Sequence, residues 1–166
     1  MPPVDLNIRL ARHDDLPAIV RLLVDDTLGS QRERYEIPLP QPYETAFAAI
    51  EIDPNNQLMV AEAGGEVIGV MQLTFIPSLT YQGSMRLQIE GVRVDERYRS
   101  QGFGQVMFTW AIELARQRGC RLVQLTTDRQ RLDAVRFYER LGFKPSHLGM
   151  KLDLLLSNMP SSEQSE

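Results

Sequence analysis

A pair of glycines between a strand pattern and a helix pattern could bind phosphate. The segment reads Arg99, Ser100, Gln101, Gly102, Phe103, Gly104 and Gln105. The first turn of a helix leaves backbone N–H groups without partners, and the helix dipole adds partial positive charge there. Gly102 and Gly104 lack the side chains that would hold a pyrophosphate away from those groups, and Arg97 and Arg99 add positive charge. The segment therefore predicts a phosphate-binding helix start.

Other phosphate-binding patterns fit this loop less well. A dinucleotide-binding loop needs a third glycine where this chain has Met107. A P-loop needs a lysine directly after its last glycine, and none stands here. An ordinary connecting loop with two turn glycines is the plain alternative.

The loop is similar to the Arg/Gln-x-x-Gly-x-Gly/Ala signature of the GNAT N-acetyltransferases. A second block, Ala134-Val-Arg-Phe137-Tyr138-Glu-Arg-Leu141-Gly142-Phe143, resembles that family's A-x-x-F-Y-E-x-L-G-F pattern. The two blocks stand in the family's order, separated by one helix and one strand pattern. The resemblance implies acetyl transfer from acetyl-CoA, with the coenzyme A pyrophosphate held by the amides of residues 99–105 and no metal.

The resemblance also gives roles to two residues near the second block. Tyr138 stands where many family members protonate the departing thiolate, and a phenol of pKa ~10 can donate to a thiolate whose thiol has a pKa near ~8.5. Tyr138 also lies on an apolar helical stripe, so simple packing is the alternative. Arg131 replaces an Asn that often contacts the cofactor; it could meet a cofactor phosphate or lie exposed at the helix start.

The strand pattern before the loop changes face part-way along. Apolar residues stand at odd positions up to Ile89 and at even positions from Val92. A strand alternates its side chains between two faces, so one face collects both sets only if a residue is inserted. A β-bulge at Glu90-Gly91 is therefore predicted, and a strand buried on both faces without a bulge is the alternative.

Acetyl transfer to an amine requires a base, and Glu90 at the predicted bulge is the candidate. An ammonium group has a pKa near ~10, so a carboxylate or a chain of waters must take its proton. An ordinary exposed strand carboxylate is the alternative. A backbone N–H near Val92 is the candidate donor to the oxyanion. By the resemblance, the backbone of Val92, Arg93 and Val94 pairs with the pantetheine arm of the cofactor.

Periodicity supplies the elements that hold these residues. Strands are expected over 6–11, 57–63, 66–76, 84–94, 121–127 and 147–154, and helices after Asp14 and over 43–52, 102–118 and 132–141. The resemblance implies an α/β (α+β) GNAT fold with a mixed, mostly antiparallel sheet of about six or seven strands, four flanking helices and splayed central strands. One domain is expected over residues 1–156, with a disordered tail over 157–166.

Composition and charge narrow the class of protein. The 166 residues are 43% hydrophobic and 24% charged, which is typical of globular domains. The net charge of −4 argues against a nucleic-acid partner or an anionic membrane surface. Cys120 is the only cysteine, so neither a disulfide framework nor a cysteine zinc site is expected. Without a signal peptide or an apolar run of about 18 residues, a cytoplasmic location is expected.

Two functional hypotheses follow. In the first, a primary amine attacks acetyl-CoA directly in a ternary complex, without a covalent intermediate on Cys120, which lies away from both motifs. In the second, the domain is catalytically degenerate, senses acetyl-CoA and regulates a partner. Mixed charges over residues 29–38 leave a small-molecule amine and a protein amine both open as the acceptor. The resemblance adds a homodimer as a further expectation.

Overall fold

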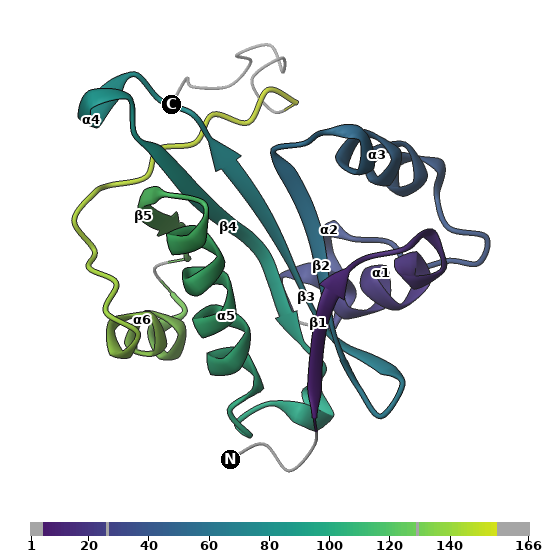
Figure 1. Cartoon of the computed structure of the whole chain (residues 1–166). Coiled ribbons are helices and arrows are strands. Elements are labelled where there is room, and N and C mark those ends of the chain that lie inside the picture. The colour runs from purple at the N-terminus through teal and green to yellow at the C-terminus, as the bar shows by residue number, and fades with distance from the viewer. Residues whose placement is uncertain (1–4, 26, 129, 156–166) are drawn as a thin grey trace, which may run out of the picture. The chain divides into compact units, whose positions relative to one another are not determined.

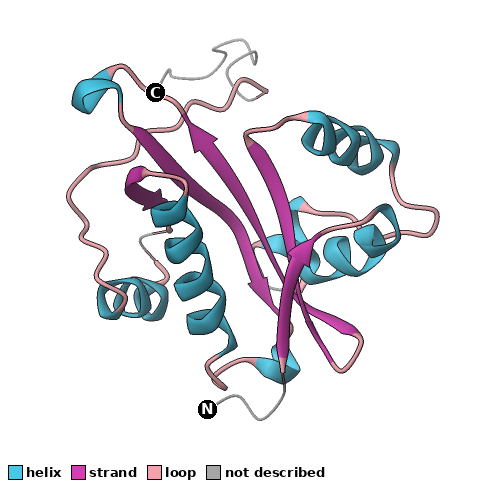
Figure 2. Cartoon of the chain, in the orientation of Figure 1, coloured by secondary structure: helices cyan, strands magenta, loops and turns pink. Residues whose placement is uncertain are grey.

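A five-stranded sheet forms the framework of residues 5–125 in a computed structural model, which describes residues 5–25, 27–128 and 130–155 (Figure 1). The strands lie side by side in chain order: β1 (Leu6–Leu10), β2 (Asn56–Ala63), β3 (Glu66–Ile76), β4 (Met85–Val94) and β5 (Cys120–Leu125). Pairing is antiparallel from β1 to β4 and parallel between β4 and β5, the strands drawn in magenta in Figure 2. The predicted mixed, mostly antiparallel sheet is confirmed.

The four predicted helices are present at nearly the predicted positions. They are α1 (Leu16–Val24), α3 (Gln41–Ile52), α5 (Phe103–Gln117) and α6 (Leu132–Arg140). Two single turns, α2 (Gly29–Arg32) and α4 (Thr80–Gly83), were expected to be loop. Asp15 rather than Asp14 secures the entry to α1, because its carboxylate accepts from the Arg12 amide at 2.7 Å and pairs with Arg9 at 2.7 Å.

The sheet has five strands among the described residues, not the expected six or seven. Residues 147–154 were expected to form a further strand, but they have no strand pairing. Their alternating apolar side chains are mostly exposed: Leu148 67%, Met150 91%, Leu152 76% and Leu154 69%. Alternation of this kind predicts a strand only if a sheet edge is available to pair with it. The predicted tail over 157–166 lies outside the described residues.

Glycines mark the turns as predicted. Gly64 and Gly65 join β2 to β3 with φ of 59° and 81°, the positive values that a two-residue hairpin needs. Gly119, with φ of 71°, follows the end of α5, where a left-handed residue satisfies the last turn of a helix. These short connections fix β2 against β3, and α5 against the start of β5.

Helices cover both faces of the sheet. α1 and α3 lie on one face and α5 on the other, as Figure 1 shows. On the first face, Ile19 and Leu22 of α1 pack with Val70 of β3. On the second, Gly69 of β3 faces α5 so closely that an added Cβ would lie 2.9 Å from the sulfur of Met107. Glycine at this position therefore allows α5 to pack close to the sheet.

The chain divides into two compact units. One is Met1–Leu125, which holds the whole sheet, and the other is Thr126–Glu166, which holds α6. The single domain expected over residues 1–156 stays a prediction. Within the described ranges, no helix combines the length and apolar character needed to cross a bilayer.

Candidate active site

A β-bulge interrupts the pairing of β3 with β4. Val70 lies opposite Arg93 and Gln72 opposite Glu90, so one residue of β3 faces two of β4, Gly91 and Val92. Gly91 has φ of 60°, a left-handed conformation that glycine adopts at little cost. The bulge predicted at Glu90-Gly91 is confirmed.

Because of the bulge, the apolar side chains of both halves of β4 lie on the same face of the sheet. Before it, Leu87 and Ile89 are buried, and they lie opposite Phe75 and Leu73 of β3. This is the α5 side of the sheet, since Arg118 at the end of α5 stacks 4.1 Å above the Phe75 ring. After the bulge, Val94 packs with Phe103 of α5. Both halves of β4 therefore direct apolar side chains towards α5, although the apolar positions change from odd to even residue numbers.

Glu90 lies on the opposite side of the sheet, with α1 and α3. It stands opposite Gln72, two residues from Val70, which packs against α1. The Glu90 side chain is exposed, so it can meet a ligand. The structure therefore allows the predicted base to reach an acceptor on this face, and its role stays a prediction.

The second half of β4 has an edge that β5 does not pair with. Residue pairs between the two strands end at Ile89 and Leu125, whereas β4 continues to Val94. The pairing stops because β5 itself ends at Leu125, and the splaying of the central strands stays a prediction. The end of β5 leaves the backbone of Val92, Arg93 and Val94 without β5 as a partner, as the expected pairing with a pantetheine arm requires. The Arg93 guanidinium donates to the Val92 carbonyl at 2.9 Å.

An ion-pair cluster fixes the loop between β4 and α5. Asp95 is buried, with 4% of its surface exposed, and its carboxylate accepts from the Arg97 side chain at 2.9 and 2.8 Å and from the Arg97 amide at 3.0 Å. Arg97 also pairs with Glu66, and Arg21 lies 3.7 Å from Asp95. Hydrogen bonds from Arg97 lower the pKa of Asp95 to about 2, against the opposing effect of burial.

Arg99 ties the same loop to the end of α1. Its Nε donates to the Val94 carbonyl at 2.9 Å, and its Nη2 donates to the carbonyl and carboxylate oxygens of Asp25, both at 3.0 Å. Arg97 and Arg99 were expected to supply positive charge to a ligand. Carboxylates pair with both side chains and hold the loop in place, and the role of their charge towards a ligand stays a prediction.

The loop presents the start of α5 to an open surface. Ser100 and Gly102 adopt positive φ of 61° and 88°, and Gly102 is the residue before the first helical turn. Among the described residues no side chain caps this helix, so the N–H groups of Phe103, Gly104 and Gln105 are the donors that a helix start leaves without intrahelical partners. A Cβ built on Gly102 would meet nothing within 4 Å. Open donors beside open space fit a bound pyrophosphate.

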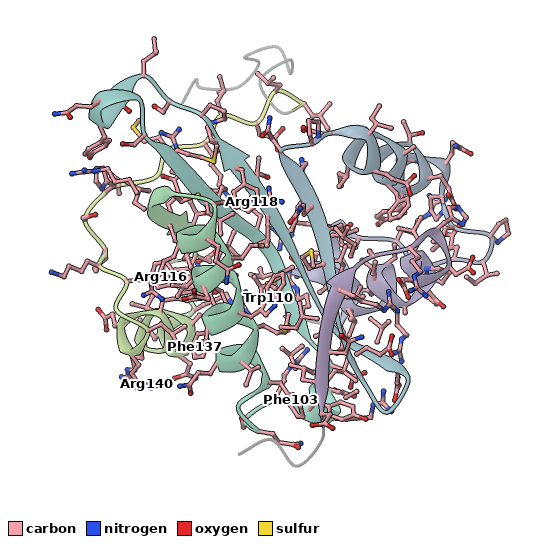
Figure 3. All side chains as sticks on the ribbon, viewed as in Figure 1. Phe103, Trp110, Arg116, Arg118, Phe137 and Arg140 are labelled. Carbon is pink, nitrogen blue, oxygen red and sulfur yellow. The ribbon has the colours of Figure 1, made fainter. Side chains whose placement is uncertain are left out.

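Two side chains of the loop have structural rather than ligand-facing positions. Phe103 is 1% exposed and packs with Ile68, and its ring meets Tyr98 edge-on at 5.7 Å. Figure 3 labels Phe103 at the first turn of α5 and Arg118 at the last. The Gln101 amide donates to the Arg97 carbonyl at 2.8 Å. Of the predicted cofactor-binding residues, Phe103 can therefore contribute its backbone only.

A row of side-chain amides beside Glu90 was missed by the sequence prediction. Gln88, two residues before Glu90 and on the same face, accepts from Gln124 of β5 at 2.6 Å. Gln72, opposite Glu90, donates to Asn56 of β2 at 3.0 Å. These half-buried amides cross the sheet on the α1 and α3 side. A polar residue inside the apolar run of β3 was the signal that could have identified Gln72.

Tyr138 and Arg131 belong to the second unit, described by itself. Tyr138 lies on α6, half-buried, with its ring edge-on to Phe137 at 5.5 Å and to Phe143 at 6.1 Å. Its carbonyl accepts from the Phe143 amide at 3.0 Å. Arg131 is exposed and precedes the first residue of α6. The thiolate-protonating and phosphate-contacting roles of these residues stay predictions.

Metal chemistry and cysteine chemistry gain no support from the arrangement. Among the described residues, no three His, Cys, Asp or Glu side chains come together as metal ligands do. Cys120 is half-buried at the start of β5, and burial raises the pKa of its thiol, which makes it a poorer nucleophile.

Comparison with known proteins identifies related sequences. A model of the acetyltransferase (GNAT) family matches residues 20–143. Aminoalkylphosphonate N-acetyltransferase from Salmonella typhimurium is 37% identical over 107 residues, which make up 64% of this chain and 69% of that protein. Glucosamine 6-phosphate N-acetyltransferase from Trypanosoma brucei brucei is 28% identical over 151 residues, or 91% of this chain and 97% of that protein.

Solved structures share the fold. A protein from Bacillus halodurans C-125, titled a transcriptional regulator, is 55% identical, with a TM-score of 0.88 over 90% of this chain and all of that chain. An acetyltransferase from Trypanosoma brucei is 28% identical, with a TM-score of 0.73 over 90% of this chain and all of that one. The match in fold therefore extends over most of both chains.

Proposed function

Because the chain belongs to the GNAT acetyltransferase family, we propose that it transfers the acetyl group of acetyl-CoA to a primary amine by direct attack in a ternary complex. Its family and its N-acetyltransferase relatives make it an acetyl-CoA-dependent acyltransferase. The proposal adds the kind of acceptor, the direct route and the residues that carry them.

The observation that carries the proposal is the bulge in β4. It separates an exposed carboxylate, Glu90, from Val92–Val94, which lie beyond the last residue pair of β4 with β5. A donor lying along that backbone edge would bring its thioester to the bulge, with Glu90 on the acceptor side of the sheet. The start of α5 would hold its phosphates through the backbone of residues 99–105.

Glu90 acts as the base in this proposal. It takes one proton from the acceptor ammonium, directly or through water, and so frees the nitrogen lone pair for attack on the thioester carbonyl. A backbone N–H at Val92 donates to the carbonyl oxygen on which negative charge develops. As the C–S bond breaks, Tyr138 donates its proton to the departing sulfur; the nitrogen releases its second proton to solvent, and Tyr138 regains a proton from solvent. Coenzyme A leaves as the thiol, and the acceptor leaves as the acetamide.

The acceptor is proposed to be a small molecule. Both named relatives act on small amines according to their names, an aminoalkylphosphonate and glucosamine 6-phosphate. The half-buried amides beside Glu90 bond one another and still have further donors and acceptors that suit a compact polar acceptor. A homodimer and a cytoplasmic location stay predictions.

The test is a thiol-release assay with acetyl-CoA and a panel of primary amines, on the native protein and on Glu90→Gln. We expect turnover with at least one small amine, and a fall in kcat/KM of about 10²-fold or more in Glu90→Gln. Glu113→Gln, which removes an exposed carboxylate from α5, is the matched control. Unchanged turnover in Glu90→Gln would remove Glu90 from the mechanism.

A regulatory function is the second candidate, because the 55% identical structure from Bacillus halodurans is titled a transcriptional regulator. In this case the protein would bind acetyl-CoA without transferring its acetyl group, and the binding itself would regulate a partner. The same panel separates the two candidates. Acetyl-CoA binding measured by calorimetry, together with no thiol release on any amine, would favour the regulatory function.

A further inference from the structure

We infer that a pocket at the start of β4 binds an anionic group of the acceptor, with Arg86 as its main ligand. The acceptor class is then a small amine that also carries a phosphonate, phosphate or carboxylate. This inference rests on the proposed acetyl transfer, and it adds a binding site at the far end of the strand that holds Glu90.

The pocket is lined by groups that donate hydrogen bonds. It is shallow and partly open, with a volume of about 10 Å³ that admits one oxygen atom the size of a water molecule, and it lies between the β3–β4 connection and the first residues of β5. Arg86 and Arg121 contribute guanidinium groups, and Ser78, Thr80 and Ser84 contribute hydroxyls beside three less polar side chains. The Ser78 and Thr80 hydroxyls bond each other and the Ser84 hydroxyl donates to the Tyr81 carbonyl, so the two guanidinium groups are the main donors. Among the described residues, no Asp or Glu lines the pocket. Arginine and hydroxyl groups without an acid form a set suited to an oxyanion.

Arg86 has an unused buried donor. Its Nε is buried and has no hydrogen-bond partner in the part of the chain that is described. A buried donor without a partner costs free energy, and a bound oxyanion would recover it. Six other arginines of the first unit each lie within 4.0 Å of a carboxylate: Arg9, Arg21, Arg34, Arg97, Arg99 and Arg116.

The second arginine of the pocket is held in place by an aromatic ring. The Arg121 guanidinium lies 5.3 Å from the centre of the Tyr81 ring. Tyr81 and Gln82 have positive φ of 51° and 61°, so the β3–β4 connection turns sharply here. Stacking leaves the edge of a guanidinium available for hydrogen bonds, because the ring contacts only its face.

Position distinguishes this pocket from the cofactor site. Arg86 and the loop after Val94 lie at opposite ends of β4, about 26 Å apart at the usual rise of a strand. Arg86 is instead on the same face as Gln88 and Glu90, and about 13 Å from Glu90 between Cα atoms. An acceptor lying along this face can therefore direct its amine to Glu90 and its anion towards Arg86, whose long side chain can lean along the strand.

The experiment compares matched acceptors that differ only in the anionic group. The pairs are 2-aminoethylphosphonate with ethylamine, and glucosamine 6-phosphate with glucosamine. We expect a higher kcat/KM for the anionic member of at least one pair, and a fall of at least about tenfold in that preference in Arg86→Gln. Arg116→Gln, which removes a positive charge from α5 outside the pocket, should keep the preference. An undiminished preference in Arg86→Gln would overturn the inference.

A binding measurement separates failure of the inference from failure of the proposed transfer. If no amine is acetylated, 2-aminoethylphosphonate and inorganic phosphate are titrated into the native protein and into Arg86→Gln, with binding followed by NMR. Binding that is lost in Arg86→Gln and kept in Arg116→Gln supports the pocket even without transfer. Equal binding by all three proteins, or no binding by any, overturns it.

Discussion

Asp95 and Arg97 form a two-bonded ion pair at the point where β4 passes into the loop before α5. The Arg97 side chain donates to both carboxylate oxygens of Asp95, at 2.9 and 2.8 Å. Asp95 is buried, whereas 52% of the Arg97 side chain is exposed. The pair therefore fixes the loop from inside and leaves the backbone beyond it facing outward.

Asp95→Asn should weaken the fold and change its response to acid. Arg97 lowers the pKa of Asp95 from 3.8 to about 2, so the pair contributes its full stabilisation above about pH 4 and loses it as the pH falls through 2. The contribution is at most about 2 kcal/mol, because solvent screens the exposed guanidinium. Urea denaturation at pH 7, 4 and 2 should show a smaller loss at low pH in Asp95→Asn than in the native protein.

The control for this variant is Asp14→Asn, which removes an exposed carboxylate near α1. Asp95→Asn should also raise the Kd for acetyl-CoA, because the loop that presents the start of α5 loses its anchor. A native-like acid response and native-like affinity in Asp95→Asn would show that the pair has no role in either.

Gly102→Ala should weaken acetyl-CoA binding more than Gly119→Ala. Both glycines have positive φ, 88° and 71°, and an added Cβ meets nothing within 4 Å at either. Each substitution therefore costs stability mainly through backbone strain, about 1 kcal/mol. Only Gly102 lies at the N-terminal end of α5, where the backbone N–H groups lack intrahelical partners. Calorimetric titration with acetyl-CoA should show a several-fold higher Kd for Gly102→Ala alone, and equal affinities would contradict the loop's role.

Gly91→Ala should lower turnover through the geometry of the bulge. Its φ of 60° is almost that of Gly64 in the β2–β3 turn, 59°, and both positions have open space for a Cβ. Gly64→Ala is therefore a control with a similar strain of about 1 kcal/mol. We expect kcat/KM for the amine to fall only in Gly91→Ala, because Glu90 and Val92 change position. Parallel losses in both variants would reduce Gly91 to a structural role.

Tyr138→Phe should lower kcat more than it raises the Kd for acetyl-CoA, since it removes only the hydroxyl that we propose donates to the thiolate. Tyr98→Phe is the control, because it keeps the ring contact with Phe103 and loses a hydroxyl elsewhere. Single-turnover rates measured with the same amine should fall for Tyr138→Phe alone. Native rates in this variant would remove Tyr138 from the mechanism.

Features set by local rules could be predicted from the sequence. Gly64-Gly65 predicts a hairpin because few other residues accept positive φ. The change of parity at Glu90 predicts a bulge because strand side chains strictly alternate. Gly102 and Gly119 bracket α5 for the same conformational reason. Each of these signals lies within a few residues of the feature that it predicts.

Features set by distant partners could not be predicted in this way. Arg99 binds Asp25, 74 residues away, and Arg97 pairs with Glu66, so the sequence alone left their positive charge available to a ligand. Residues 147–154 alternate like a strand, but strand formation depends on an edge that no local pattern reveals. The contact between Gln88 and Gln124 depends on the register of β4 with β5, which the sequence does not state.

The bulge also sets where this chain tolerates changes in length. Deleting one residue from Glu90–Val92 would remove the bulge, because the bulge is the one extra residue of β4, and would leave Val94 facing Phe103 and Arg93 opposite Val70. The packing against α5 would survive, but the separation of Glu90 from Val92 would be lost. A residue inserted between Leu87 and Ile89 would instead turn one of these two side chains away from α5. Natural variants of this protein should therefore differ in length in the loops before α3 and at α4, and keep the residue count of β4 constant.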